Sequence, residues 1–186
     1  MELKNNYECI AYFTARLMYH LNVYALKKNM FFNQNKKILY RGIKIPYSNL
    51  LPYERARGKI IVLTSFTSTS ENKDKALHFA KRKNSKDLYK KNLLFSVMYI
   101  IKNIWEFYYI PNGINIQNIS DYAKEKEVLF QPFSFYYVEK VDINLSKFTA
   151  DIYLETIGKT AIFEEKLKEG KEIFYDGCED IIRFKN

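Results

Sequence analysis

Cysteine and histidine are scarce in this chain of 186 residues, which contains two of each. Cys9 and Cys178 stand far apart, outside the spacing of a zinc site, and two cysteines are too few for a disulfide framework. His20 and His78 lie away from any nucleophile motif. We therefore expect free thiols and no metal site.

Glycine is also rare, and its positions exclude the common nucleotide-binding loops. The six glycines are Gly42, Gly58, Gly113, Gly158, Gly170 and Gly177. Neither the Gly-x-Gly-x-x-Gly fingerprint of dinucleotide-binding βαβ units nor a phosphate-binding P-loop can be written from these positions. A dinucleotide would have to bind this chain in another way.

Long hydrophobic runs are missing as well. No stretch reaches the ~18 apolar residues of a membrane span, and the amino terminus lacks a charged segment that leads into an apolar run. We expect a soluble protein with no visible signal peptide. Its location is left open, with a cytosol, its own or that of a host cell, favoured over the extracellular space.

Positive charge is plentiful, but it is not concentrated in one segment. The formal net charge is +9, and the sequence pI is about 9.3. Short basic clusters at 27–28, 36–37 and 81–83 are separated by neutral and aromatic residues. We interpret this as a solvated basic surface, with no membrane contact; nucleic acid or another acidic partner is the alternative.

Length and composition predict one folded α+β domain over residues 1–186. Hydrophobic residues make up 47% of the chain and aromatic residues 17%, which is enough for a buried core. Near the start, three- and four-residue steps connect Ile10, Phe13, Leu17, Leu21, Tyr24 and Ala25. This pattern predicts a helix over 7–28 that covers a sheet, within an N-terminal helical part of about 1–35.

Strand-like segments dominate the rest of the chain. Predicted strands span 37–40, 60–66, 93–101, 114–119, 127–133, 135–143 and about 149–155. Shorter helical segments are expected at 48–57, 71–82 and 161–168, the second with Ser70 at its N-cap. Because strands and helices do not alternate, this order predicts a mostly antiparallel sheet and no βαβ units.

Glu125 and Glu127 provide two carboxylates at positions i and i+2. Residues with this spacing on a strand project from the same face, so both carboxylates can reach one ligand. A solvated strand start is the alternative interpretation of such a pair when it stands alone.

Arg41 and a run of three hydroxyl residues form two further motifs. Arg41 carries a permanent charge and forked donors that match phosphate oxygens, and Gly42 lets the backbone come close. Ser68, Thr69 and Ser70 lie where a predicted strand meets a predicted helix, and free amides there favour anionic groups. Taken singly, an Arg-Gly pair is also typical of a surface turn, and Ser70 of a helix cap.

Three segments carry these motifs in the order, local context and spacing of one known active site. They are Leu39-Tyr40-Arg41-Gly42, Ser65-Phe66-Thr67-Ser68-Thr69-Ser70 and Glu125-Lys126-Glu127-Val128-Leu129-Phe130-Gln131-Pro132-Phe133. Together they resemble the arginine-specific mono-ADP-ribosyltransferase family, over roughly 39–141. The resemblance implies transfer of ADP-ribose from NAD to an arginine side chain of a target protein, with release of nicotinamide. Whether such an enzyme is an effector, a toxin-like protein or an endogenous modifier stays open.

The fold implied by the resemblance is a split β-sandwich. It consists of two roughly perpendicular, mostly antiparallel sheets with N-terminal and flanking helices, and NAD lies in the cleft between the sheets. NAD is the expected co-substrate, and no metal is expected. The family also has a mobile turn that contacts the target protein, which corresponds to about 120–124 here, with Tyr122 as a candidate contact.

The resemblance also implies a role for each motif residue. Glu127 is expected to hydrogen-bond the nicotinamide ribose, with Ser68 holding it in place, while Glu125 orients the acceptor guanidinium. Because cleavage of the nicotinamide–ribose bond builds positive charge on the sugar, a fixed carboxylate stabilises the transition state. The predicted catalytic residues are Arg41, Ser68, Glu125 and Glu127. The predicted NAD contacts are Arg41, Gly42, Ser68, Thr69, Ser70 and Glu127.

Three questions stay open at this point. The aromatic residue that stacks on nicotinamide is one of Tyr40, Phe66, Phe79 and Trp105. An NAD glycohydrolase, with water as the acceptor, would use the same site. A basic, tyrosine-rich binding module with idle motif residues is an alternative of another class.

Overall fold

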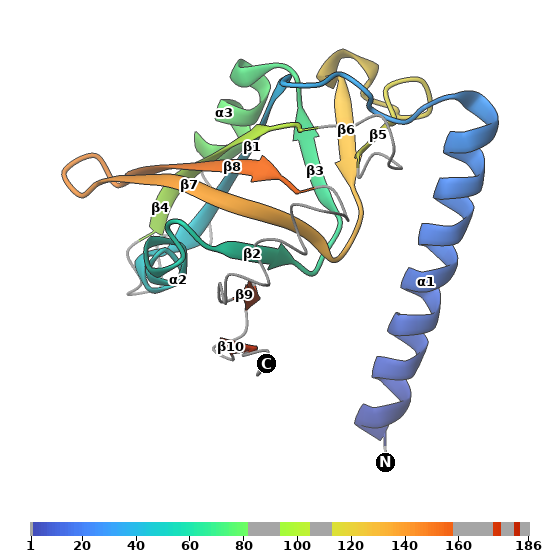
Figure 1. Cartoon of the computed structure of the whole chain (residues 1–186), viewed down its shortest axis with the longest axis horizontal. Helices are drawn as coiled ribbons and strands as arrows, with labels where there is room; N and C mark the ends of the chain where they lie inside the picture. The colour runs from blue at the N-terminus through green and yellow to red at the C-terminus, as the bar shows by residue number, and fades with distance from the viewer. Residues whose placement is uncertain (1, 82–93, 105–112, 158–172, 176–180, 183–186) are drawn as a thin grey trace.

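A computed structural model of the chain describes residues 2–81, 94–104, 113–157, 173–175 and 181–182. A long helix, α1 (Glu2–Lys28), is followed by strands and short helices (Figure 1). The short helices are η1 (Tyr47–Asn49), α2 (Leu51–Arg55), α3 (Lys73–Lys81) and η3 (Ala123–Glu125). The helix predicted at 161–168 lies outside the described residues.

The described strands form one ten-stranded sheet in the order β10-β9-β2-β7-β8-β4-β1-β3-β6-β5. The strands are β1 (Ile38–Pro46), β2 (Ile60–Leu63), β3 (Thr67–Ser70), β4 (Leu94–Lys102), β5 (Gly113–Asn115), β6 (Glu127–Phe130), β7 (Ser134–Asn144), β8 (Thr149–Thr156), β9 (Ile173–Tyr175) and β10 (Ile181–Ile182). Among these strands only β2–β9 and β4–β8 pair in parallel. The predicted α+β class and the mostly antiparallel pairing are confirmed.

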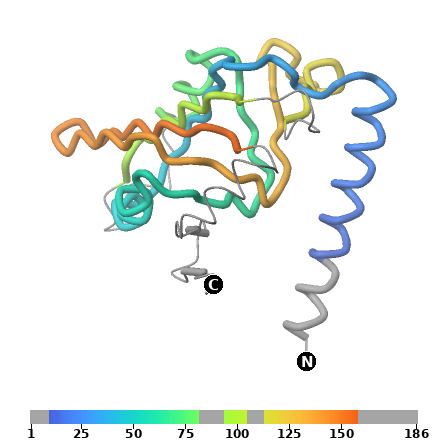
Figure 2. The backbone as a smooth tube through the Cα atoms, in the orientation of Figure 1, coloured from blue at the N-terminus to red at the C-terminus, as the bar shows by residue number. Residues whose placement is uncertain are grey.

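The sheet is curled into one continuous surface, whereas two sheets were expected. The curl is visible in the backbone trace (Figure 2). One residue pair, Tyr40 with Ser70, joins β1 to β3, whereas β1 and β4 pair from Ile38 to Pro46. β3 carries the hydroxyl motif and β6 begins with Glu127. Together with β5 they therefore form a wing attached through the end of β3.

The main core lies inside the curl and is built by alternation along the strands. On β7, Tyr136 and Val138 are buried while Tyr137 between them is half-buried, as period-2 patterning requires. The largest fully buried side chains include Tyr136, Phe95, Phe130, Leu39, Leu50, Ile101, Ile152 and Leu154. This core fixes β1, which carries Arg41, against β4, and it holds the buried face of β6.

α1 differs from its predicted role. The helix forms, but it does not cover the sheet: Ile10 and Phe13 are 62% and 67% exposed, and Tyr24 is exposed too. Only its C-terminal end packs on the body, where Ala25 is fully buried in a small cluster with Met30 and Ile114. The spacing predicted the helix correctly, but it could not tell which partner covers the apolar face.

The segment before α3 also differs from the prediction. Asn72, not Ser70, caps this helix, because the Asn72 Oδ1 atom accepts from the amides of Asp74 at 2.9 Å and Lys75 at 3.4 Å. Ser70 is the last residue of β3, so the hydroxyl motif is itself a strand. β1 is longer than expected, and Arg41 and Gly42 lie within it and not after it.

Candidate active site

One cleft brings together most of the residues that the sequence singled out. It has a volume of about 200 Å³. Its lining consists of Tyr40, Arg41, Gly42, Ile43, Ser68, Thr69, Ser70, Ala76, Phe79 and Glu125. Residues as far apart in sequence as Tyr40 and Glu125 therefore meet at the junction of β1, β3, α3 and η3.

Arg41 spans the junction between β1 and β3. It shares a strand face with Leu39 and Ile43, which belong to or pack on the main core. Its Nη1 atom donates to the carbonyl of Ser68 at 3.1 Å. A guanidinium has five N–H donors, and this is its one hydrogen bond to the described residues, so most of its donors remain available for an anionic ligand.

The β3–β6 pair sorts its side chains onto two faces. Thr67, Thr69, Val128 and Phe130 are buried. On the opposite face Ser68 pairs with Leu129, and Ser70 pairs with Glu127. Thr69 contributes to the fold, because its Oγ1 atom donates to the carbonyl of Val128 at 2.6 Å.

Glu127 begins β6 on the same face as Ser68 and Ser70. It is half-buried and does not line the cleft, unlike the other predicted catalytic residues. Ser68 sits diagonally across the pair from Glu127, a separation of about 7–8 Å between positions in such pairs. The hydrogen bond between their side chains stays a prediction.

Glu125 does not lie on the same strand as Glu127. The expectation that both carboxylates project from one face of a strand is therefore wrong. It is the last residue of η3, and Lys126 follows in the left-handed conformation with φ of 47°. The buried hydroxyl of Ser70 donates to the Glu125 carbonyl and accepts from the amide of Asn72 at 2.9 Å. The amide of Glu71 also donates to the Lys126 carbonyl at 3.3 Å. A tight turn anchored to the end of β3 therefore directs Glu125 to the cleft.

The carboxylates of Glu125 and Glu127 make no ion pair or side-chain hydrogen bond with any residue that the structure describes. Nearby Lys37 is instead paired with Glu71, at 3.1 Å between Nζ and Oε2. Both acids can therefore accept hydrogen bonds from ligands.

Opposite the strands, the cleft is lined by apolar residues of α3, Ala76 and Phe79. Gly42 is the point of closest approach: a Cβ atom placed there would lie 1.7 Å from the carbonyl oxygen of Ala76 and 2.8 Å from the amide nitrogen of Ala80. The predicted close approach at Gly42 is thus to α3. Ala76 was not predicted to line the cleft, although small residues four apart on a predicted helix can indicate close packing.

Two of the four candidate stacking aromatics lie at the cleft. Tyr40 and Phe79 line it, and Phe79 is 46% exposed. The Nζ atom of Lys73 lies 5.9 Å from the centre of the Tyr40 ring. Phe66 is half-buried away from the lining, and Trp105 lies outside the described residues.

Tyr136 is a buried polar residue close enough to Arg41 to respond to its charge. Its hydroxyl has no hydrogen-bond partner among the residues described, and the hydroxyl of Ser134 donates instead to the carbonyl of Gln131 at 2.7 Å. Burial raises the pKa of Tyr136 well above its ordinary value, and the nearby Ser134 hydroxyl and Arg41 charge lower it only in part.

No group of three or more His, Cys, Asp or Glu side chains in the described part of the chain could hold a metal ion. None of the described helices is both long enough and apolar enough to cross a membrane.

Comparison with known proteins gives matches only among solved structures. No protein-family model matches the chain, and no curated protein matches it significantly. The ADP-ribosyltransferase Vis, a toxin from Vibrio splendidus, aligns with a TM-score of 0.58 and 22% identity over 81% of this chain and 58% of that chain.

Two further structures of Vis agree. The structure with the inhibitor M6 gives a TM-score of 0.60 and 22% identity over 81% of this chain and 59% of Vis. The structure with agmatine gives a TM-score of 0.59 and 21% identity over 81% and 60%. The chain thus has the fold of this ADP-ribosyltransferase and spans about three fifths of its length.

Proposed function

We propose that this chain transfers ADP-ribose from NAD to an arginine side chain of a target protein and releases nicotinamide. The observation that supports this function most directly is that Arg41, Ser68 and Glu125 line one cleft in a chain with the fold of Vis. In this proposal residues 1–186 form one catalytic domain, and the wing of β3, β6 and β5 corresponds to the second sheet of a split sandwich. That Vis is a toxin supports a toxin-like role.

The cleft suits the nicotinamide end of NAD. Its volume of about 200 Å³ is below the ~300–1,000 Å³ typical of pockets that enclose a whole ligand, so the adenosine half would extend over the surface. The uncommitted donors of Arg41 would hold the diphosphate. Tyr40 or Phe79 would stack on the nicotinamide ring.

Bond cleavage would depend on Glu127. The bond between C1′ of the ribose and the nicotinamide nitrogen breaks, and nicotinamide leaves with the electron pair. The positive charge left on the sugar is stabilised by the carboxylate of Glu127, which would bind a ribose hydroxyl and be held by Ser68.

The acceptor step would depend on Glu125. A guanidinium nitrogen of the target attacks C1′, and its proton passes to the Glu125 carboxylate as the new bond forms. A carboxylate without an ion pair among the described residues, at the rim of a cleft, can bind a guanidinium through paired hydrogen bonds. The structure of Vis with agmatine supports this choice of acceptor, because agmatine carries the same guanidinium group as arginine.

Tyr122 would contact the target protein. It is 69% exposed and directly precedes η3, which ends at Glu125. An aromatic side chain beside the acceptor site can pack on a protein surface while Glu125 binds the arginine.

A second candidate function, hydrolysis of NAD, shares the site. Ser68 is exposed at the cleft, so water has access to the sugar in the absence of a target. In that case nicotinamide would be released and no acceptor would be modified.

Incubation of the purified chain with NAD and agmatine tests the proposal. Putrescine, which has the same four-carbon chain and no guanidinium, is the matched control acceptor. We expect mass spectrometry to detect ADP-ribosyl-agmatine and no putrescine adduct. Nicotinamide release without an adduct would favour the hydrolase, and the absence of both products would refute both functions.

A further inference from the structure

α1 exposes more large apolar side chains than any other described element. On one side of the helix, Ile10 and Phe13 are 62% and 67% exposed, and Tyr24 is 40% exposed. Leu17 and Leu21 between them are half-buried. We call these five residues the α1 stripe.

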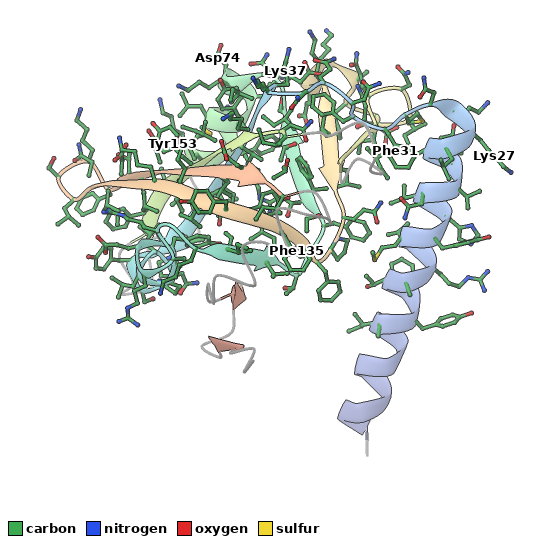
Figure 3. All side chains as sticks on the ribbon, in the orientation of Figure 1. Lys27, Phe31, Lys37, Asp74, Phe135 and Tyr153 are labelled. Carbon is green, nitrogen blue, oxygen red and sulfur yellow. The ribbon has the colours of Figure 1, made fainter. Side chains whose placement is uncertain are left out.

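The body of the protein covers only the C-terminal end of the α1 stripe, where Leu21 packs against the cluster of Ala25, Met30 and Ile114. The helix is held at its C-terminal end, where Ala25 is buried and the side chains of Asn22 and Gln131 exchange two hydrogen bonds. Figure 1 shows that the rest of α1 runs free of the strands. In Figure 3, Phe31 lies on the strand side of the end of α1, while Lys27 points away from the strands.

The spacing of the α1 stripe is that of a helix-pairing seam. Ile10, Leu17 and Tyr24 are seven residues apart, and Phe13 and Leu21 lie between them. A seven-residue apolar repeat keeps one seam facing a partner helix. From Ile10 to Tyr24 the seam runs for about 21 Å.

The opposite side of α1 is less suited to a partner. Its exposed large side chains are Tyr12, Tyr19 and Leu26, and the hydroxyls of the two tyrosines tolerate water. The hydroxyl of Tyr12 accepts a hydrogen bond from Arg16 at 2.9 Å, and the Arg16 guanidinium lies 5.8 Å from the Tyr12 ring. The ring of Tyr19 packs against His20 with 5.4 Å between ring centres.

We propose that two copies of this chain associate through their α1 stripes, with the two helices antiparallel and Leu17 at the centre. Residue Ile10 of one copy then faces Tyr24 of the other. This dimer is independent of the proposed enzymatic activity.

Charge favours the antiparallel arrangement. The first turns of α1 contain two acidic residues, Glu2 and Glu8, and one basic residue, Lys4, while the last turn contains Lys27 and Lys28. Antiparallel helices bring the basic end of one copy beside the acidic end of the other and also oppose the helix dipoles. Parallel helices would place Lys27 and Lys28 of both copies together.

The position of the body favours the same arrangement. Each body is attached at the C-terminal end of its α1. In an antiparallel pair the two bodies lie at opposite ends of the helix pair, so neither body blocks the N-terminal half of the other helix. A parallel pair would bring both bodies to the same end.

The area of the α1 stripe predicts a weak dimer. Covering five partly exposed apolar side chains on each copy removes on the order of 1,000 Å² of surface in total, near the lower limit of specific interfaces. The dimer should therefore form in the micromolar range and dissociate on dilution.

Sedimentation equilibrium of the full chain tests the association. We expect the mass to rise from 22.2 kDa toward twice that value across the micromolar range. Phe13→Glu should stay monomeric at all concentrations, because it places a charge in the seam. The control Leu145→Glu changes a residue that is 60% exposed in the β7–β8 turn, and it should dimerise normally.

Several results would overturn the proposal. These are a wild-type chain that stays monomeric at high concentration, a Phe13→Glu variant that still dimerises, and loss of the dimer in Leu145→Glu. Circular dichroism checks that each variant keeps its helix and strand content. Binding of lipid vesicles by a monomeric wild-type chain would assign the α1 stripe to a membrane surface instead.

Disulfide trapping tests the direction of the helices. In a background with Cys9→Ser and Cys178→Ser, Ile10→Cys and Tyr24→Cys are made as separate variants. We expect a disulfide-linked dimer under mild oxidation only when the two variants are mixed. A cross-link within Ile10→Cys alone would show parallel helices and contradict the proposed arrangement.

Discussion

The hydroxyl of Ser70 donates a hydrogen bond to the backbone carbonyl of Glu125 and thereby ties the end of β3 to the turn that presents an acid to the cleft. Ser70→Ala removes this bond and the acceptor for the amide of Asn72. Loss of these two part-buried hydrogen bonds should lower the free energy of unfolding by about 1–3 kcal/mol.

The Ser70→Ala variant should lose more transfer to agmatine than NAD cleavage, because Glu125 loses its support. Urea denaturation and the two activities check this. Ser146→Ala is the matched control, since among the described residues the Ser146 hydroxyl bonds only to Asn144, at 2.8 Å in an exposed turn. Equal losses of transfer in both variants would contradict the role of Ser70.

Lys126 gives a second test of the same turn. Its left-handed backbone, with φ of 47°, separates Glu125 from Glu127. Lys126→Gly should keep both activities, because glycine adopts this conformation without strain. Lys126→Val should cost about 1–2 kcal/mol of stability and should reduce transfer. Full transfer by the valine variant would show that the turn does not need this conformation.

Gly42 should tolerate no side chain. Gly42→Ala places a Cβ atom against the backbone of α3, and it should lower the free energy of unfolding by about 3 kcal/mol. At Gly58 an added Cβ atom would have open space, with its nearest contact at 3.9 Å, but the backbone φ of 73° is strained for alanine. Gly58→Ala should therefore lower the free energy of unfolding by about 1 kcal/mol. A smaller loss at Gly42 than at Gly58 in chemical denaturation would contradict the observed packing.

Tyr136 should make stability depend on alkaline pH. Its pKa is raised by burial, so above pH ~10 the unfolded chain releases a proton that the folded chain keeps. The free energy of unfolding should therefore fall as the pH rises through this range. Tyr136→Phe should be at least as stable at pH 7, since it removes an unpaired hydroxyl.

The difference between Tyr136→Phe and the wild type should grow in favour of the variant by about 1.4 kcal/mol for each pH unit above ~10. Denaturation curves at several pH values measure it. A difference that stays constant with pH would show that the hydroxyl titrates as it does in water.

The meeting of the motifs could be predicted from the sequence only through the resemblance. Arg41 and Ser68 are distant along the chain, and no periodicity places them together. In the structure Arg41 and Ser68 are brought together by one residue pair between β1 and β3, Tyr40 with Ser70. Within β6 the side chains do alternate as in an ordinary strand, with Val128 and Phe130 buried and Leu129 between them half-buried.

Local exceptions could not be predicted. The spacing of Glu125 and Glu127 indicated a strand, but Lys126 adopts a left-handed conformation that lysine rarely takes, and so Glu125 lies outside the strand that Glu127 begins. Asn72 caps α3, whereas the hydroxyl of Ser70, the predicted cap, donates to the carbonyl of Glu125, far along the chain. Such long-range bonds leave no signal in a local pattern.

The most direct test of the proposed function measures NAD cleavage and transfer to agmatine side by side in two variants. Glu127→Gln should lose both activities by about 100-fold or more, because the charge that stabilises the transition state is gone. Glu125→Gln should lose transfer but keep NAD cleavage. Full transfer activity in either variant would contradict the account.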